Sequence, residues 1–313
     1  MPPPKDTSEK QLSSNRPKVS VITPSLNHAR FLRDTIESVL AQSYPNVEHI
    51  IADGGSTDGT VAILKEYGSR IRWVSERETD ENPILEAYRK AFALSTGDYI
   101  IQCCVSDGFL NRNWFRMCVD ALEADPEISV VWGLDQYMSE DGNLGRVVPP
   151  EFVEKPAPQK RDFLPLWFAH GTCVPEPNYC IRRAVFDACF PERNSKDPMS
   201  YNPSHTFNYR FNTLGYLPWF LPVVANYCRG HGGQRGVHLR EKETQVHRHY
   251  LDAVKRYEKD VLAGRVRHQF RDGQSRVIGE VGSRDLPALK KSIFAFRLKH
   301  SLRKKLQRII SRL

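Results

Sequence analysis

The sequence lacks the features that mark membrane-spanning, secreted or disulfide-rich proteins. It contains no run of about 20 apolar residues, the length that a membrane-spanning helix needs. The first residues, MPPPKDTSEKQLSSNRPK, have no apolar centre of the kind found in a signal peptide. The seven cysteines include no C-x-x-C pair, which favours reduced, buried thiols over a disulfide framework or a zinc site. We therefore expect a soluble, cytoplasmic protein.

Acidic residues are absent after Asp285, although the formal net charge of the whole chain is only +8. The bases of this last segment are Lys290, Lys291, Arg297, Lys299, Arg303, Lys304, Lys305, Arg308 and Arg312. Its apolar residues fall on the other side: Ile293, Phe296, Leu302, Leu306, Ile309, Ile310 and Leu313. Such a basic amphipathic helix can lie on an anionic membrane surface, or it can dock on the rest of the chain or on a partner subunit. No nucleic-acid recognition motif accompanies the charge, so we expect no nucleic-acid partner.

A glycine-rich phosphate loop is also missing after the first predicted strand. That strand, Val19–Ile22, is followed by a turn that reads Thr-Pro-Ser-Leu-Asn. Nicotinamide-dependent enzymes with a doubly wound sheet bind the cofactor's diphosphate on a glycine-rich turn at this place. The sequence therefore argues against redox chemistry of that class.

The chain has 313 residues, of which 40% are hydrophobic, so it can bury one large core or two modest ones. Strand and helix patterns alternate as far as Trp132, which predicts an α/β fold with a doubly wound, mostly parallel sheet. The expected strands are 19–22, 47–52, 71–74, 98–105 and 128–132. We expect residues 1–16 to be disordered, residues 17–235 to form the main domain, and residues 236–313 to form a helical extension.

The predicted sheet is organised around the stretch Ile50–Thr60, which reads I-I-A-D-G-G-S-T-D-G-T. A β-branched run delivers Asp53 to the carboxyl end of a strand, and two glycines let the backbone turn before a helix begins. Ligands of open α/β sheets lie beyond the carboxyl ends of the strands. The ends at Thr23 and Asp107 share this edge, so three polar turns should converge on one cleft. Asp-Gly-Gly-Ser is also ordinary turn chemistry, which leaves a purely connecting role open.

Five blocks of sequence resemble, in order and spacing, the family 2 inverting glycosyltransferases of the GT-A fold. They are V-S-V-I-T-P-S-x-N from Val19, S-V-L-x-Q-S-Y-P from Ser38, D-G-G-S-T-D-G-T from Asp53, W-V-S-E from Trp73, and T-G-D from Thr96 followed by Ser106-Asp107. The similarity covers roughly residues 17–235. It implies transfer of a sugar from a nucleotide donor. A base deprotonates the acceptor hydroxyl while the anomeric carbon is attacked from the face opposite the diphosphate.

The resemblance implies a site for the nucleotide sugar in the polar turns. Its residues are Thr23, Pro24, Ser25, Asn27, Asp53, Gly54, Gly55, Ser56, Asp58, Glu86, Arg89 and Ser106. Asp107 is the implied ligand of Mg²⁺ or Mn²⁺, because such cations prefer carboxylate oxygen and take phosphate and water as their other ligands. His231 lies in a His-Gly-Gly turn that resembles the family's closing motif, which implies contact with the diphosphate or the metal.

Two departures from the family pattern concern the donor site. Relatives commonly have a second carboxylate beside the one at Asp107, whereas this chain has Val105 before it and Gly108 after it. The family's Asp-Ala-x-Asn pattern reads Glu86-Ala87-Tyr88-Arg89 here. Arg89 either faces phosphate or is a solvated helix residue.

A third departure concerns the catalytic base. Relatives place an aspartate just before the helix that we expect at 207–214, and here Ser204, His205 and Thr206 stand there. His205 can accept a hydroxyl proton, since an imidazole titrates near neutrality, or it can make a structural hydrogen bond. Asp197 is the nearest acid upstream and the other candidate.

The leading hypothesis is an inverting hexosyltransferase that moves a sugar from a nucleotide donor, expected to be a UDP-sugar. The expected acceptor is a hydroxyl of a glycan or of a lipid-linked saccharide in surface polysaccharide synthesis. Lipid-linked acceptors lie at the inner face of the membrane, where the basic helix would attach the protein peripherally. The alternative is a catalytically silent protein that keeps the cleft as a binding or scaffold module.

Overall fold

The computed structural model describes residues 16–79, 81–148, 158–174, 178–192, 195–233 and 240–310. The predicted disordered segment 1–16 lies, except for its last residue, outside these ranges. The first half of the chain alternates strands and helices: β1 (Val19–Ser25), α2 (Ala29–Leu40), β2 (Val47–Asp53), α3 (Thr60–Tyr67), η1 (Gly68–Arg70), β3 (Arg72–Ser75), α4 (Pro83–Leu94), β4 (Tyr99–Gln102), β5 (Gly108–Phe109), α5 (Trp114–Ala124) and β6 (Ile128–Met138). The five predicted strands are all present, although the fourth, predicted at 98–105, ends at Gln102.

The second half contains several short elements, the long strand β9 and two long helices. They are β7 (Leu144–Val148), η2 (Lys160–Asp162), α6 (Phe163–His170), β8 (Cys180–Arg182), α7 (Arg183–Cys189), η3 (Pro198–Tyr201), α8 (Pro203–Thr213), β9 (Leu217–Arg229), α10 (Arg240–Leu262), β10 (Gln269–Arg271), β11 (Val277–Glu280) and α11 (Leu286–Ile310). The helix predicted at 207–214 is therefore α8, which begins four residues earlier because Asn202 caps it and accepts a hydrogen bond from the backbone of Ser204.

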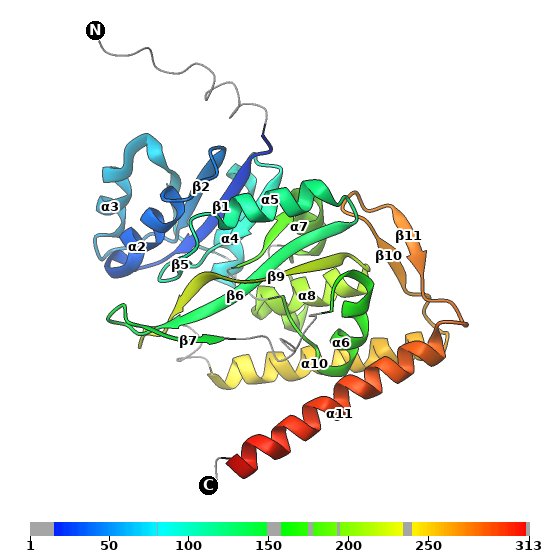
Figure 1. Cartoon of the computed structure of the whole chain (residues 1–313). Helices are drawn as coiled ribbons and strands as arrows, with labels where there is room; N and C mark the ends of the chain where they lie inside the picture. The colour runs from blue at the N-terminus through cyan, green and yellow to red at the C-terminus, as the bar shows by residue number, and fades with distance from the viewer. Residues whose placement is uncertain are drawn as a thin grey trace.

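Nine of the described strands form one sheet in the order β3-β2-β1-β4-β8-β6-β9-β5, with β7 paired to β6. The first four are parallel neighbours, as the alternating pattern predicts. The second half is mixed: β8 runs antiparallel between β4 and β6, β9 is parallel to β6, and β5 is antiparallel to β9. Figure 1 shows β6 and β9 as long, curled strands across the middle of the molecule. This α/β architecture confirms the predicted fold class.

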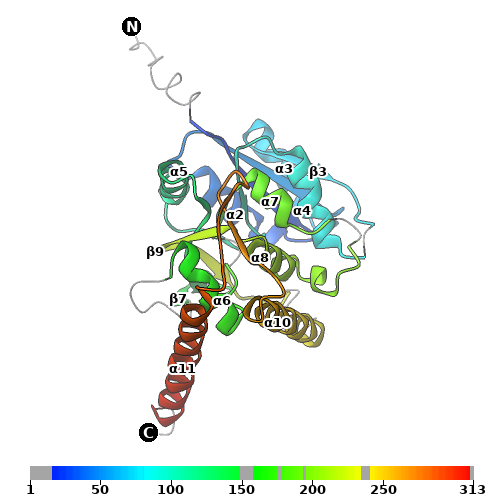
Figure 2. The same ribbon diagram turned by 90° about the vertical axis from the view of Figure 1, so that its right-hand side faces the viewer.

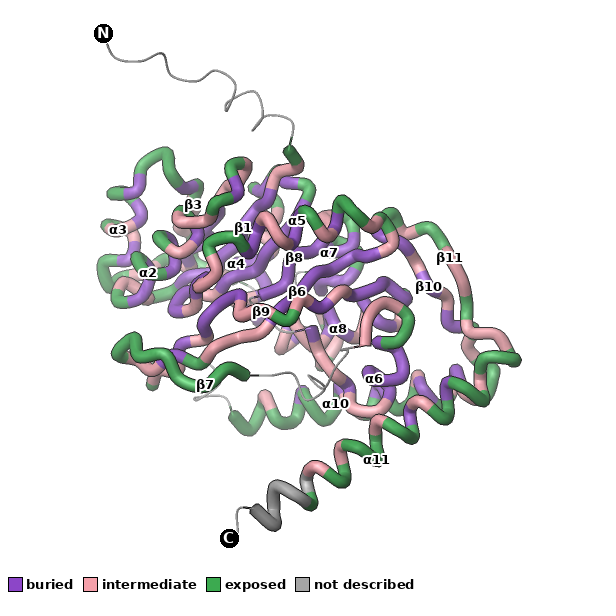
Figure 3. The backbone as a smooth tube through the Cα atoms, in the orientation of Figure 1, coloured by how far each residue is buried: buried purple, intermediate pink, exposed green. Residues whose placement is uncertain are grey.

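Successive residues of a strand point to opposite sides of the sheet, so an apolar strand gives the sheet two apolar faces. Helices cover both of these faces. Val21 of β1 belongs to a core with residues of α2 and α5, whereas Ile22 packs in a second core with Leu85 and Tyr88 of α4. The sheet is the most completely buried layer (Figure 3). Four of the cysteines are buried in these cores, as predicted: Cys103, Cys118, Cys180 and Cys189.

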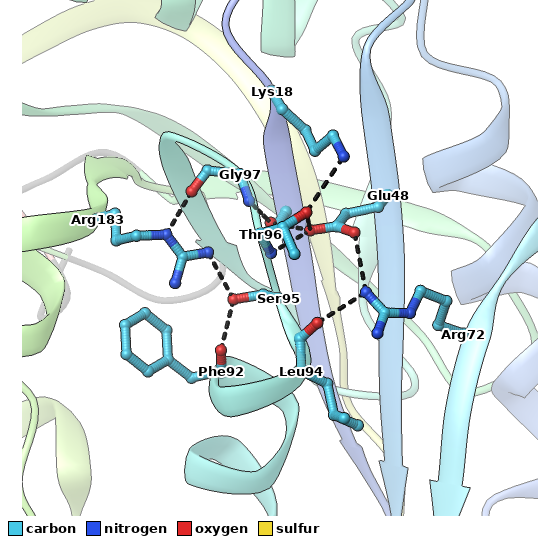
Figure 4. Close-up of polar contacts among 10 residues, drawn as sticks. Lys18, Glu48, Arg72, Phe92, Leu94, Ser95, Thr96, Gly97 and Arg183 are labelled. Carbon is cyan, nitrogen blue, oxygen red and sulfur yellow. Dashed lines mark hydrogen bonds and ion pairs between the residues drawn. The ribbon is translucent and has the colours of Figure 1, made fainter.

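A polar network fastens the amino ends of the parallel strands (Figure 4). Glu48 accepts hydrogen bonds from Ser20 Oγ at 2.6 Å and from the backbone N–H of Thr96 at 2.6 Å. A Cβ on Gly97 would lie 2.6 Å from the carbonyl oxygen of Lys18, so only glycine fits there. The Thr96-Gly97-Asp98 block of the family resemblance therefore joins α4 to the sheet, at the edge opposite the polar turns.

The residues after 240 pack onto the main sheet domain through helices. Contacts join α10 to α6, α8 and η3, and α11 to α6. Figures 1 and 2 show α11 leaving the body of the molecule toward its carboxyl end. None of the described helices combines the length and apolar character needed to cross a bilayer.

Candidate active site

The turn after β2 is built on Asp53, whose side chain is 1% exposed. Its carboxylate accepts hydrogen bonds from the backbone N–H of Gly55 (3.1 Å) and Ser56 (2.9 Å). The hydroxyls of Ser75 (2.7 Å) and Ser56 also donate to it. These four bonds use both carboxylate oxygens to shape the turn. Asp53 therefore reaches the predicted edge of the sheet, but in this conformation it holds the loop that would contact a nucleoside.

The loop after β1 is bound to this turn through Asn27. The backbone N–H of Asn27 donates to Ser56 Oγ at 2.7 Å, and its Oδ1 accepts from the backbone N–H of Thr57 at 2.8 Å. Asn27 has φ 53°, a left-handed conformation that costs energy for any residue with a Cβ and that concentrates at functional sites. The predicted nucleotide-site residues at 25–27 and 53–56 thus form one joined surface.

Two members of the predicted nucleotide site have structural roles instead. Thr23 is fully buried within the sheet, and its Oγ1 lies 2.9 Å from Nε2 of His49. Asp58 accepts from the backbone N–H of Ala29 at 3.0 Å and of Thr60 at 3.1 Å, so it caps the starts of both α2 and α3; it also accepts from Thr60 Oγ1 at 2.6 Å. Burial acts to raise the pKa of Asp58, but these hydrogen bonds outweigh it and lower the pKa.

The Ser106-Asp107-Gly108 turn lies at the carboxyl end of β4, where Thr35 of α2 holds it in place. Thr35 Oγ1 donates to the carbonyl of Asp107 at 2.7 Å and accepts from the backbone N–H of Ser106 at 3.2 Å. Ser106 has φ 91°, a second left-handed residue in the predicted site. Asp107 Oδ1 accepts a 3.0 Å hydrogen bond from the backbone N–H of Arg229. The acid is therefore clamped between α2 and the end of β9.

Gly108 leaves no room for a carboxylate directly after Asp107. It pairs with Tyr227 across β5 and β9. A Cβ built on Gly108 would lie 2.6 Å from Tyr227 Oη and 2.7 Å from Ser38 Oγ. The tyrosine hydroxyl thus occupies the space that any larger side chain at position 108 would need.

The end of β9 brings His231 close to α2. The Arg229 guanidinium forms an ion pair with Asp34 of α2 at 2.7 Å and lies over the ring of Phe31, 4.9 Å from its centroid. The His231 ring lies 4.8 Å from Phe31 and 6.1 Å from His28, measured between ring centroids. Burial lowers the pKa of His231. Asp107 and His231 are therefore both held against α2, Asp107 by Thr35 and His231 by Phe31.

A divalent cation needs oxygen ligands, and Asp107 offers a carboxylate. No group of three or more His, Cys, Asp or Glu side chains converges as a metal cage among the residues that the structure describes. Magnesium is commonly held by one or two carboxylates together with substrate phosphates and water. Asp107 fits that kind of site, in which the donor's diphosphate provides most of the ligands.

Arg89 and Glu86 differ from their predicted roles. Arg89 is neither phosphate-facing nor solvated: it donates to the carbonyls of Pro191 (2.8 Å) and Phe190 and to the carboxylate of Asp187 (2.9 Å). Its side chain is 9% exposed, so it fastens α4 to the end of α7. Glu86 is 2% exposed and accepts from the backbone N–H of Thr79 at 2.6 Å. It anchors the loop after β3.

The two predicted catalytic bases also make structural contacts. Asp197 Oδ1 accepts from the backbone N–H of Met199 at 2.9 Å and caps η3. His205 lies between α8 and α10, with Nε2 2.9 Å from Nδ1 of His247 and its ring edge-on to Tyr250. Burial, and then His247, lower the pKa of His205 to about 4. These contacts favour the structural alternative for His205.

Sequence reasoning missed the residues that hold the acid in place. Thr35, Tyr227 and Arg229 lie on α2 and β9, far from the Ser-Asp-Gly turn in sequence. The glycine after Asp107 was the available signal, since it indicates close approach of another chain segment.

Comparisons with known proteins find a matching family and several relatives. A model of the family described as Glycosyl transferase family 2 matches residues 20–190. The chondroitin synthase of Escherichia coli is 32% identical over 131 residues, which are 41% of this chain and 18% of that protein. The uncharacterized glycosyltransferase Rv1514c of Mycobacterium tuberculosis is 32% identical over 148 residues, 46% of this chain and 52% of that protein. The matches thus span only part of each relative's length.

Two solved structures have a similar fold. TarS of S. aureus in complex with UDP-GlcNAc has a TM-score of 0.52 at 18% identity, over 69% of this chain and 60% of that chain. The mannosyltransferase PcManGT of Pyrobaculum calidifontis, in complex with GDP-Man and Mn²⁺, has a TM-score of 0.54 at 19% identity, over 93% of this chain and 74% of that chain. At these identities the likeness concerns the fold.

Proposed function

This chain belongs to glycosyl transferase family 2 and has the GT-A fold, and we propose that it is an inverting hexosyltransferase that uses a nucleoside-diphosphate sugar. The observation that carries the proposal is the position of Asp107. It follows β4, the parallel neighbour of β1, and is held by Thr35 and Arg229 at the carboxyl edge of these strands. That edge is where open α/β sheets bind ligands.

The donor would occupy the surface formed by residues 25–27, 53–56 and 106–107. Ser25 and Asn27, with the Gly54-Gly55-Ser56 turn, would contact the nucleoside. Asp107 would hold Mg²⁺ or Mn²⁺ against the diphosphate, and His231 would lie beside the phosphates. The cation supplies positive charge that stabilises the leaving diphosphate. Asp107 is the natural ligand because it is a carboxylate on a rigid, doubly anchored turn.

We propose a UDP-sugar as the donor and a hydroxyl of a glycan or lipid-linked saccharide as the acceptor. The chain is similar to TarS, whose structure holds UDP-GlcNAc, and to chondroitin synthase, whose name states that it makes a polysaccharide. PcManGT was solved with GDP-Man, so a guanine nucleotide is the competing donor class. The departures at Gly108 and before His205 keep the catalytically silent binding protein as the second hypothesis.

A donor screen tests the proposal. Thermal unfolding is measured with UDP-GlcNAc, UDP-glucose, UDP-galactose and GDP-mannose, each with Mn²⁺, because a ligand that binds the folded chain raises its melting temperature. For the donor that binds, the release of nucleoside diphosphate is then measured with the native protein and with Asp107→Asn. We expect turnover by the native protein only. Binding without turnover in either protein would favour the silent module.

We also propose that α11 attaches the protein to an anionic membrane surface. The helix uses one side for the body of the molecule, since Leu289 and Ile293 are buried against it. Another side exposes Phe294 (67%), Leu298 (48%) and Leu302 (56%), spaced four residues apart along one stripe. The exposed bases on this helix include Lys290, Lys291, Lys299 and Lys305, and it has no acid. An apolar stripe among bases complements anionic headgroups above an acyl interior.

Sedimentation with vesicles tests the membrane proposal. The protein should bind vesicles that contain phosphatidylglycerol more strongly than vesicles of phosphatidylcholine alone, and added salt should weaken the binding. Replacing Phe294 and Leu298 by serine should abolish it. Val277 of β11 is 49% exposed and provides a matched apolar control as Val277→Ser. Equal binding by native protein and the α11 variant would overturn the proposal.

A further inference from the structure

A half-buried carboxylate that the donor site does not use lies on the neighbouring strand β6. Asp135 Oδ1 accepts a 2.7 Å hydrogen bond from Nδ2 of Asn178, and Asn226 on β9 also hydrogen-bonds to it. Asn178 is itself fixed, because its amide makes two further bonds with the backbone of Gly133. The carboxylate of Asp135 is therefore held in one orientation by side-chain amides.

The strand register places Asp135 at a defined offset from Asp107. Asp135 pairs with Asn226 of β9, and Gly108 of β5 pairs with Tyr227 on the other side of that strand. Two strand spacings separate the backbones, a distance of about 10 Å. Cys228 is close to both acids: after burial, which is the larger cause, both Asp107 and Asp135 raise the pKa of its thiol. The two carboxylates therefore lie near the same side chain of β9.

An inverting transfer needs a base that is set apart from the diphosphate. The diphosphate leaves from one face of the anomeric carbon while the acceptor oxygen approaches from the other, so the base and the phosphate site lie on opposite sides of a sugar ring. Asp197 and His205, the alternatives from sequence, are used in a helix cap and in the contact between α8 and α10.

We propose that Asp135 is the general base of the transfer, a proposal that rests on the function proposed above. The acceptor O–H proton passes to a carboxylate oxygen of Asp135 as the acceptor oxygen bonds to the anomeric carbon. The bond from that carbon to the phosphate oxygen breaks, and its electron pair leaves with the nucleoside diphosphate. Atoms and charge balance without any further reactant.

The surroundings of Asp135 suit this task. Burial raises its pKa to about 6, partly offset by the hydrogen bonds from Asn178 and Asn226. The group is therefore ionised at neutral pH, yet it is a stronger base than an exposed aspartate. The two residues that follow Asn226 on β9, Tyr227 and Cys228, are titratable, and burial raises the pKa of both, so both are neutral.

The test compares Asp135→Asn with His205→Gln in the hydrolysis of the best donor from the screen, with water as acceptor. We expect Asp135→Asn to lower kcat by about 100-fold or more, without changing the donor's effect on melting temperature, and His205→Gln to keep kcat within about threefold. Turnover by Asp135→Asn at the native level would overturn the proposal. If the native protein binds a donor but turns none over, the proposed function fails first and this assignment fails with it.

A pH profile provides the second measurement, in case Asp135→Asn folds poorly. The native kcat should fall below about pH 6, where Asp135 becomes protonated. In Asn226→Ser the carboxylate loses a hydrogen bond that stabilises its charged form, so the acidic limb should move to higher pH. An unmoved limb would show that another group limits the rate and would contradict the proposal.

Discussion

Asp107 and Arg229 are joined by a 3.0 Å hydrogen bond from the backbone N–H of Arg229 to Oδ1 of the aspartate, across 122 residues of sequence. The bond fixes the carboxylate through main chain, which leaves the Arg229 side chain to pair with Asp34. The acid at the strand end and the closing turn at His231 are thereby parts of one rigid unit.

Asp107→Asn should separate the role of the charge from the role of this hydrogen bond. The amide oxygen can still accept from Arg229, so the melting temperature should stay close to the native value. The variant should lose the extra stabilisation that Mn²⁺ gives with UDP, and its turnover should fall about 100-fold or more. Asp120→Asn, at an exposed position of α5, is the control and should behave as native. Undiminished turnover in Asp107→Asn would contradict the assignment.

Gly108→Ala should destabilise the fold through Tyr227. The added Cβ would meet Tyr227 Oη at 2.6 Å, and overpacking of this kind costs about 1–3 kcal/mol in unfolding free energy. Gly232→Ala is the control, since no atom lies within 4 Å of its Cβ position. Adding Tyr227→Phe to Gly108→Ala should recover part of the loss, because it removes the clashing oxygen. Denaturant unfolding measures all four proteins, and equal stability of the two single glycine variants would refute the argument.

The sequence predicted most of the fold because strand and helix periodicity are local properties. β1 to β4 and their helices follow from apolar patterns within short windows, and the turn chemistry at Asp53 places their carboxyl ends at one edge. The mixed half of the sheet did not follow: β8 has only three residues, and its place between β4 and β6 depends on contacts across many residues.

The candidate site was predictable in position but not in the partners of each side chain. Arg89 could be assigned to phosphate or to solvent from sequence, but its acceptors lie about 100 residues later, at Asp187 and Pro191. Asp135 gave no signal, because it lies within an apolar strand and its importance arises from Asn178 and Asn226 on neighbouring segments. Local sequence patterns do not predict long-range pairing of this kind.

Arg89→Ala should test the role of that side chain in packing. The buried guanidinium bonds to two backbone carbonyls and to Asp187, so its removal should cost about 2 kcal/mol in unfolding free energy and leave donor affinity unchanged. Arg33→Ala removes an exposed pair with Glu66 and should leave the stability close to native, because solvent screens such pairs. The measurements are chemical denaturation and donor titration. A weaker donor affinity in Arg89→Ala, at unchanged stability, would instead support contact between Arg89 and the donor's phosphates.

Glu78 should give the stability of the chain a dependence on pH. It lies in the loop after β3. Lys90 of α4 forms an ion pair with Glu78 at 3.0 Å and a second ion pair with Glu86 at 3.4 Å. Burial raises the pKa of Glu78 from 4.5 to about 7, and Lys90 offsets part of this effect.

The sign follows from which state holds the proton. Between pH 4.5 and about 7 the folded chain keeps the Glu78 proton while the unfolded chain has lost it, so stability falls as the pH rises through this window. Glu78→Gln removes the titrating group. The variant's melting temperature, relative to native, should therefore be higher at pH 8 than at pH 5. The control is Glu81→Gln, which should show no such change, because the native Glu81 side chain is 88% exposed.

Glu78 also lies close to the turn that would hold the donor nucleoside. Because a Cβ on Gly54 would lie 3.4 Å from Cγ of Glu78, the protonation of Glu78 acts directly beside that turn. A difference between Glu78→Gln and native that is the same at both pH values would mean that Glu78 ionises as freely in the folded chain as in the unfolded one.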